Sequence, residues 1–113
     1  MRLKQIIEEL ELKPVYLSDP EVEVKGGYAG DLLSNVMAGA KEGDIWITIQ
    51  GHQNIVAIAL LVDVAAVIIA QDMEIEEKAL KRAEEKGINL LQSPLYTYEI
   101  AGQLYSLGIG ENN

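Results

Sequence analysis

The chain has 113 residues, enough for one folded domain, and its 49% hydrophobic and 24% charged residues are typical of a globular protein. Its formal net charge is −9, so we expect neither nucleic acid nor an anionic membrane as a partner, because both bind to basic surfaces. It has no cysteine, which excludes disulfides, thiol catalysis and cysteine-ligated metals, and a cytoplasmic location is expected.

The first quarter of the chain predicts a helix and a strand. Apolar residues from Leu3 to Leu10 recur at helical spacing, so residues 1–13 are expected to form an amphipathic helix that ends before Pro14. Val22 and Val24 alternate with charged residues, which predicts a half-exposed strand.

A glycine pair and an aspartate then mark the next boundary. Gly26-Gly27 is expected to break the strand and form a turn. Asp31 is a good N-cap for a helix that carries apolar residues on one face as far as Ala40.

The middle of the chain is its most hydrophobic part. Ile45 to Ile49 is β-branched or aromatic almost throughout and predicts a strand, and Val64 to Ala70 predicts a second, fully buried one. Between them, Ile55 to Val62 predicts a helix without a polar face. Such a helix lies either wholly in the core or half in a dimer interface, and the sequence leaves both possibilities open.

The last part predicts a charged helix, a strand and a final helix. The helix is expected from Glu74 to Lys86, and the strand from Ile88 to Leu91. A last helix carries apolar residues from Tyr96 onward, and the tail from Glu111 is expected to be loose.

The repeated order of strand and helix predicts an α/β fold with three α/β/α layers and a mainly parallel sheet of about four strands. We expect one domain over residues 1–113, with the opening helix in 1–13 and the α/β core in 21–109.

Ligands of parallel sheets bind at the carboxyl ends of the strands, so the polar residues that follow three predicted strands are the candidate site. These tentative ligand-binding residues are Gln50, His52, Gln53, Asn54, Gln71, Asp72 and Thr97. His52, the sole histidine, could act as a base oriented by Asp72, but no nucleophile accompanies it. Asp31 and Asp72 are interpreted as helix caps, and neither a metal site nor a cofactor is expected.

The order and spacing of several segments from about Glu21 onward resemble the DRTGG domain family. The segments are Gly30-Asp31-Leu32-Leu33-Ser34, Asp44-Ile45-Trp46-Ile47-Thr48, Gln50-Gly51-His52-Gln53-Asn54-Ile55-Val56-Ala57 and the apolar strand that ends at Gln71-Asp72. The Asp-Arg and Thr-Gly-Gly that name the family would fall near Gly51-His52 and Ala70-Gln71-Asp72, and neither is present. The chain is therefore similar to the stand-alone, diverged members found beside iron-hydrogenase genes.

The resemblance implies a fold similar to the N-terminal domain of HPr kinase and no catalytic activity of the domain itself. It implies a regulatory or protein-interaction domain, a homodimer, that acts on a partner in a hydrogenase system or elsewhere in redox or energy metabolism. The alternative is a sensor that binds a nucleotide or another anion at the candidate site. An acid–base enzyme that uses His52 and Asp72 is the third hypothesis.

Overall fold

The central strands are apolar at almost every position, so side chains from both of their faces enter a core. In β3 (Asp44–Thr48), Ile45 and Ile47 point to one face of the sheet, and Trp46 points to the other. β4 (Ala66–Ile69) and β5 (Leu90–Gln92) alternate in the same way. Two hydrophobic clusters result, one on each face of the sheet.

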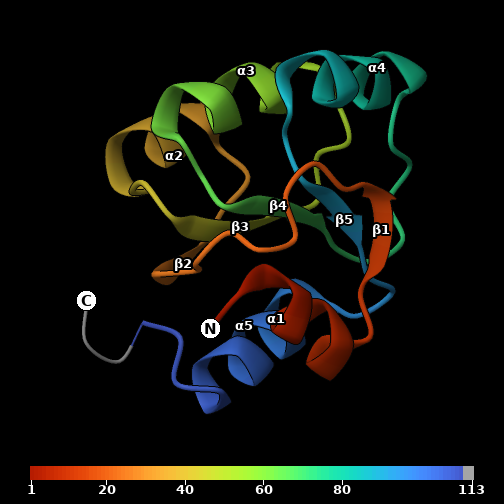
Figure 1. Cartoon of the computed structure of the whole chain (residues 1–113). Helices are drawn as coiled ribbons and strands as arrows, with labels where there is room; N and C mark the ends of the chain where they lie inside the picture. The colour runs from red at the N-terminus through yellow and green to blue at the C-terminus, as the bar shows by residue number, and fades with distance from the viewer. Residues whose placement is uncertain (111–113) are drawn as a thin grey trace.

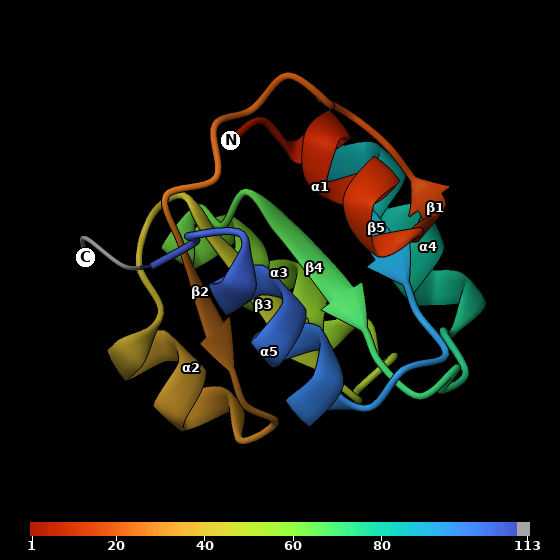
Figure 2. The same cartoon turned by 90° about the horizontal axis from the view of Figure 1, so that it is seen from below.

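Helices cover both faces, as Figure 1 shows in the computed structural model, which describes residues 1–110. One layer consists of α2 (Leu33–Gly39), α3 (Asn54–Val62) and α4 (Glu77–Lys86). The other consists of α1 (Leu3–Leu10) and α5 (Thr97–Ser106), which lie in front of the sheet in Figure 2. The predicted three-layer α/β/α fold is confirmed.

Within the described residues the sheet has five strands in the order β1-β5-β4-β3-β2, where about four were predicted. β2 (Gly26–Ala29), β3, β4 and β5 are parallel, and β1 (Lys13–Tyr16) pairs antiparallel with β5. The prediction missed β1 because Pro14 was interpreted as the end of the first helix. Proline is also tolerated in an edge strand, which is where Pro14 lies.

The predicted strand at Val22 and Val24 is wrong. In the part of the chain that the structure describes, this segment makes only an isolated bridge, between Arg2 and Glu23, and Val24 is buried in the cluster beneath α1 and α5. Gly26 and Gly27 do not break a strand but begin one, because β3 supplies their pairing partners, Asp44 and Ile45.

α4 begins at Glu77, three residues later than predicted, because residues 71 and 72 form a turn and 73–76 have no regular secondary structure. The loop that precedes β2 is held by Asn89, a buried side chain at the amino end of β5. The Asn89 Oδ1 atom accepts hydrogen bonds from the backbone N–H groups of Ser18 and Asp19, at 2.7 and 2.8 Å. Its Nδ2 atom donates to the carbonyls of Asp19 and Ala65, so both ends of the amide are satisfied.

α3 is not wholly buried, which was one of the two possibilities that its sequence left open. Ile55, Val56 and Ala59 are buried, whereas Leu60 is 48% and Leu61 70% exposed. One face of the helix therefore belongs to the core, and the other is an apolar surface.

Within residues 1–110, no helix combines the length and apolar character needed to cross a bilayer. The expected loose tail, 111–113, lies outside the described residues.

Candidate functional site

The carboxyl ends of β3, β4 and β5 lie next to one another, as parallel pairing requires. Thr48 pairs with Ile69, and Ile69 pairs with Gln92. The loops that follow these strands therefore share one edge of the sheet, which we call the carboxyl edge. Most of the predicted site residues occupy these loops.

Asp31 fastens this edge instead of capping a helix. Its Oδ1 atom accepts hydrogen bonds from the Thr48 hydroxyl and from the Ile49 backbone N–H, both at 2.9 Å. α2 begins at Leu33 and no side chain caps it, so the predicted N-cap role of Asp31 is wrong. The Gln50 side-chain amide donates to the Asp31 carbonyl, so Gln50 belongs to the same hydrogen-bond network.

His52 lies beside a glutamate that the sequence analysis missed. The His52 Nε2 atom is 3.9 Å from Glu76 Oε1, and the same oxygen accepts a hydrogen bond from the Gln53 backbone N–H at 3.2 Å. The His52 Nδ1 atom accepts from the Asn54 N–H at 3.1 Å. Glu76, not Asp72, is therefore the carboxylate paired with His52.

Gly51 explains why Glu76 comes so close. The Glu76 backbone N–H donates to the Gly51 carbonyl at 2.9 Å. A Cβ atom at Gly51 would lie 1.9 Å from the carbonyl oxygen of Glu74, so only glycine allows the loop before α3 to pack against the loop before α4. The contact between these two loops joins residues 23 positions apart in the sequence, so no local sequence pattern predicts it.

Gln71 and Asp72 form a sharp turn after β4. Both have left-handed backbone conformations, with φ of 60° and 49°. Their N–H groups donate to the carbonyls of Leu95 and Ser93, at 2.9 and 3.0 Å, which ties this turn to the loop before α5. Because α4 begins five residues later, the predicted role of Asp72 as a helix cap is wrong.

The structure thus brings Gln50, His52, Gln53 and Asn54 together and adds Glu76. Gln71 and Asp72 occupy the adjacent loop at the same edge. Thr97 is the first residue of α5, in the helix layer on the other side of the sheet, and the described hydrogen bonds do not connect it to His52.

The chemistry available at the carboxyl edge is limited. A small pocket of about 330 Å³ is lined by Gln50, Gly51, His52, Glu74 and Glu76. Its two glutamates make it unfavourable for a phosphate, and the described contacts of His52 include no nucleophile. No cluster of His, Asp or Glu suited to a metal ion occurs in the part of the chain that the structure describes.

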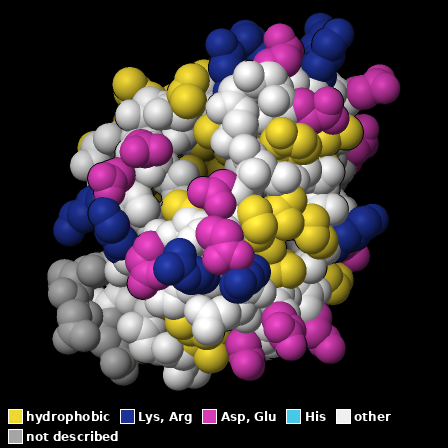
Figure 3. Space-filling model, viewed as in Figure 1, with side chains coloured by type: hydrophobic (Ala, Val, Ile, Leu, Met, Phe, Trp, Pro, Cys, Tyr) yellow, Lys and Arg dark blue, Asp and Glu magenta, His cyan; other side chains and the backbone are white. Residues whose placement is uncertain are grey.

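A second, larger groove begins at the same place and runs between α3 and α4. It has a volume of about 490 Å³, and Gln53 and Asn54 form its end nearest the carboxyl edge. Its floor is aliphatic, and two basic residues of α4 form one wall; these lining residues are Val56, Ala57, Leu60, Leu61, Arg82 and Lys86. We call it the α3–α4 groove. Figure 3 shows basic side chains interspersed with acidic ones at the top of the molecule, over α4.

Three comparisons with known proteins agree with this architecture. The profile of the DRTGG domain family matches residues 28–107. HPr kinase/phosphorylase of Streptococcus uberis is 27% identical over 121 residues, which cover 90% of this chain and 38% of the relative.

A solved structure is similar in fold. It contains the CBS and DRTGG domains of the regulatory region of a Clostridium perfringens pyrophosphatase, in complex with the activator diadenosine tetraphosphate. The match has a TM-score of 0.73 at 15% identity and covers 91% of this chain and 45% of that one. The chain therefore spans less than half the length of either relative.

Proposed function

This chain belongs to the DRTGG domain family, and from that premise we propose that it is a non-catalytic regulatory domain that acts as a homodimer through α3. The similar pyrophosphatase segment is part of a regulatory region, which supports a regulatory role. The contacts of His52, which are a backbone N–H and a carboxylate, support the absence of catalysis, because a base needs a nucleophile or substrate proton within reach.

The proposed dimer rests on the apolar outward face of α3. Ala57, Leu60 and Leu61 are exposed, and no polar side chain separates them along the helix. Covering a leucine side chain contributes about 1.5 to 3 kcal/mol relative to leaving it in water. In a twofold dimer the same patch lies on both subunits, so Leu61 of one copy would pack against α3 of the other.

The area required extends this interface beyond one helix. A stable dimer covers about 800 Å² on each partner, roughly an eighth of the 6204 Å² surface of the chain. Met37, an exposed residue of α2, belongs to the same helix layer as Leu61 and would extend the apolar area.

Sedimentation velocity tests the dimer. We expect the wild-type protein to sediment as a dimer and the Leu61→Glu variant as a monomer with an unchanged circular dichroism spectrum, because a buried unpaired carboxylate would oppose association. Tyr98→Glu is the matched control, since it places the same charge at an exposed position in the other helix layer. A wild-type monomer at every concentration, or a dimer that survives Leu61→Glu, would contradict the proposal.

The setting of this regulation is proposed as the cytoplasm, with a partner in redox or energy metabolism such as a hydrogenase system. The two relatives, a kinase/phosphorylase of HPr and a pyrophosphatase, support a metabolic setting in general. Purification of the tagged chain from its own cells tests the partner, and recovery of no enzyme of these classes would contradict it.

A second candidate function is a sensor of nucleotides or related anions. The pyrophosphatase relative is in complex with diadenosine tetraphosphate, and Arg82 and Lys86 give the α3–α4 groove two cations next to Gln53 and Asn54. Thermal melting with a panel of nucleotides tests it. A ligand at a hundred times its dissociation constant stabilises by about 2.7 kcal/mol, and Arg82→Gln should remove that shift. If no nucleotide raises the melting temperature, the sensor function is contradicted and the protein-contact function stands as the single proposal.

A further inference from the structure

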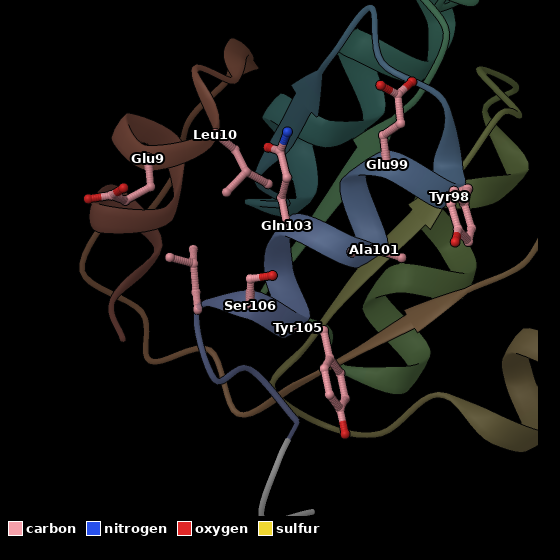
Figure 4. A pocket seen from close by; sticks show the side chains of 10 residues that line it. Glu9, Leu10, Tyr98, Glu99, Ala101, Gln103, Tyr105 and Ser106 are labelled. Atoms are coloured by element: carbon pink, nitrogen blue, oxygen red, sulfur yellow. The ribbon is translucent and has the colours of Figure 1, made fainter.

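A broad groove lies on the opposite side of the sheet, between α1 and the outer face of α5. Its volume is about 890 Å³, and Figure 4 shows the side chains that line it. Glu9 and Leu10 come from the end of α1, and the other lining residues come from α5 and the residue after it. We call it the α1–α5 groove. It shares no residue with the α3–α4 groove or the carboxyl edge.

Two tyrosines of α5 border this groove with their rings in water. Tyr98 is 88% and Tyr105 62% exposed, and both project from the same side of α5 in Figure 4. Gly102 lies between them in the sequence, and a Cβ atom there would have no neighbour within 4 Å. The backbone at Gly102 therefore forms an open floor beside two accessible ring faces.

The charge of this groove has one sign. Glu9 and Glu99 line it from its two helices, and none of its ten described lining residues is basic. The carboxyl end of α1, which carries the negative pole of that helix, lies at Leu10, and its last turn has no basic residue. Figure 3 shows acidic side chains along the lower edge of the molecule, where α1 lies.

We propose that the α1–α5 groove binds a cationic segment of a partner protein. Arginine and lysine side chains bind to the faces of tyrosine rings through cation–π contacts. Arginine also binds carboxylates such as those of Glu9 and Glu99, since its planar fork matches a carboxylate.

A second copy of the chain fits this groove poorly. In a twofold contact Glu9 and Glu99 would face acidic residues of the other copy, and each chain carries a net charge of −9. The groove is therefore assigned to a different protein, and it stays accessible when α3 forms a dimer on the opposite face.

Fluorescence anisotropy with a short labelled peptide of alternating arginine and leucine tests the proposal. We expect Tyr98→Ala/Tyr105→Ala to weaken binding roughly tenfold, from the loss of two cation–π contacts, without a change in net charge. We expect a similar loss for Glu9→Gln/Glu99→Gln at low ionic strength. Glutamine at position 99 can still accept the hydrogen bond from the Tyr96 N–H, so α5 keeps its N-terminal contact.

A control pair of substitutions distinguishes binding at this groove from the general attraction of a cationic peptide to an acidic protein. Glu84→Gln/Glu85→Gln removes two charges from exposed positions of α4, in the other layer, and should change the affinity less than about twofold. Gly102→Gln fills the floor of the groove and should weaken binding without unfolding the chain. The proposal is overturned if the wild type does not bind the peptide, if both glutamate pairs weaken it equally, or if the tyrosine double variant binds like wild type.

Discussion

The two helix layers bury the same sheet in similar ways but present opposite surfaces to the solvent. Inward, each has fully buried aliphatic residues, such as Ile55 in α3 and Ile100 in α5. Outward, α3 exposes leucines beside the basic residues of α4, whereas α5 exposes tyrosines beside glutamates. Core packing requires only the inward residues, so it does not explain the contrast between the outward faces, and the two binding surfaces proposed above would.

The layers also differ in how they are fastened. On the α3–α4 side, two loops approach so closely that Gly51 leaves no space for a side chain. On the α1–α5 side, α1 is joined to the segment 20–24 by backbone hydrogen bonds and by exposed ion pairs such as Lys4–Glu21. The first side should therefore be sensitive to added volume, and the second to pH and salt.

The largest effect is expected from Trp46, the fully buried ring beneath the α2–α3–α4 layer. Trp46→Ala should lower the free energy of unfolding by about 4 kcal/mol, because it leaves a large cavity and removes the hydrogen bond from Nε1 to the Gly30 carbonyl. Urea denaturation measures this. A loss below about 1 kcal/mol would mean that this layer packs less closely than the structure indicates.

Gly51→Ala comes next, with an expected loss of about 2 to 3 kcal/mol in urea denaturation, because the new methyl group must displace the Glu74 backbone. The displacement would also separate His52 from Glu76, so the imidazole signals of His52 should shift in the NMR spectrum. A variant as stable as wild type, with unchanged His52 signals, would contradict the close packing of these two loops.

Gly51 also shows how far the sequence could predict this site. The rule for parallel sheets placed Gln50, His52, Gln53 and Asn54 correctly at one edge, because β-branched residues define β3 unambiguously. The partner of His52 could not be predicted, because Glu76 reaches it only through the packing of two loops.

The sheet shows the same division between local and distant causes. The buried strands β3 and β4 were predictable from their own residues. The edge strands were not, since β2 begins with two glycines and β1 contains a proline, and their strand geometry depends on pairing with β3 and β5. In the same way, the left-handed turn at Gln71 and Asp72 has no glycine, the residue that usually marks such a conformation.

Gly102→Ala is the counterpart of Gly51→Ala in the other layer and should have the opposite sign. Gly102 is an exposed helical position with free space around it, so alanine should raise the free energy of unfolding by about 1 kcal/mol through its higher helix propensity. For a domain of this size the melting temperature should rise by roughly 5 °C. A destabilised variant would show that α5 is covered at this position.

The smallest effect concerns the ion pair between α1 and the segment that follows β1. The Lys4 ammonium donates a hydrogen bond to Glu21 at 2.8 Å, and it lowers the pKa of that carboxyl below its ordinary value of 4.5. A carboxyl with a lowered pKa in the folded state stabilises the fold above its unfolded pKa and loses this contribution as the pH falls through the folded value. The stability of the wild type relative to Lys4→Gln should therefore be greatest above about pH 5 and disappear in acid.

Side-chain carboxyl NMR measures this directly, since the pKa of Glu21 should rise toward its ordinary value in Lys4→Gln and in high salt. The same titration should leave the stability change of Gly51→Ala untouched, because that change depends on volume and not on charge. If Lys4→Gln does not change the pKa of Glu21, the Lys4–Glu21 pair does not help to hold α1, and its backbone hydrogen bonds and buried side chains do so instead. The two layers would then be fastened alike, and only their outward faces would distinguish them.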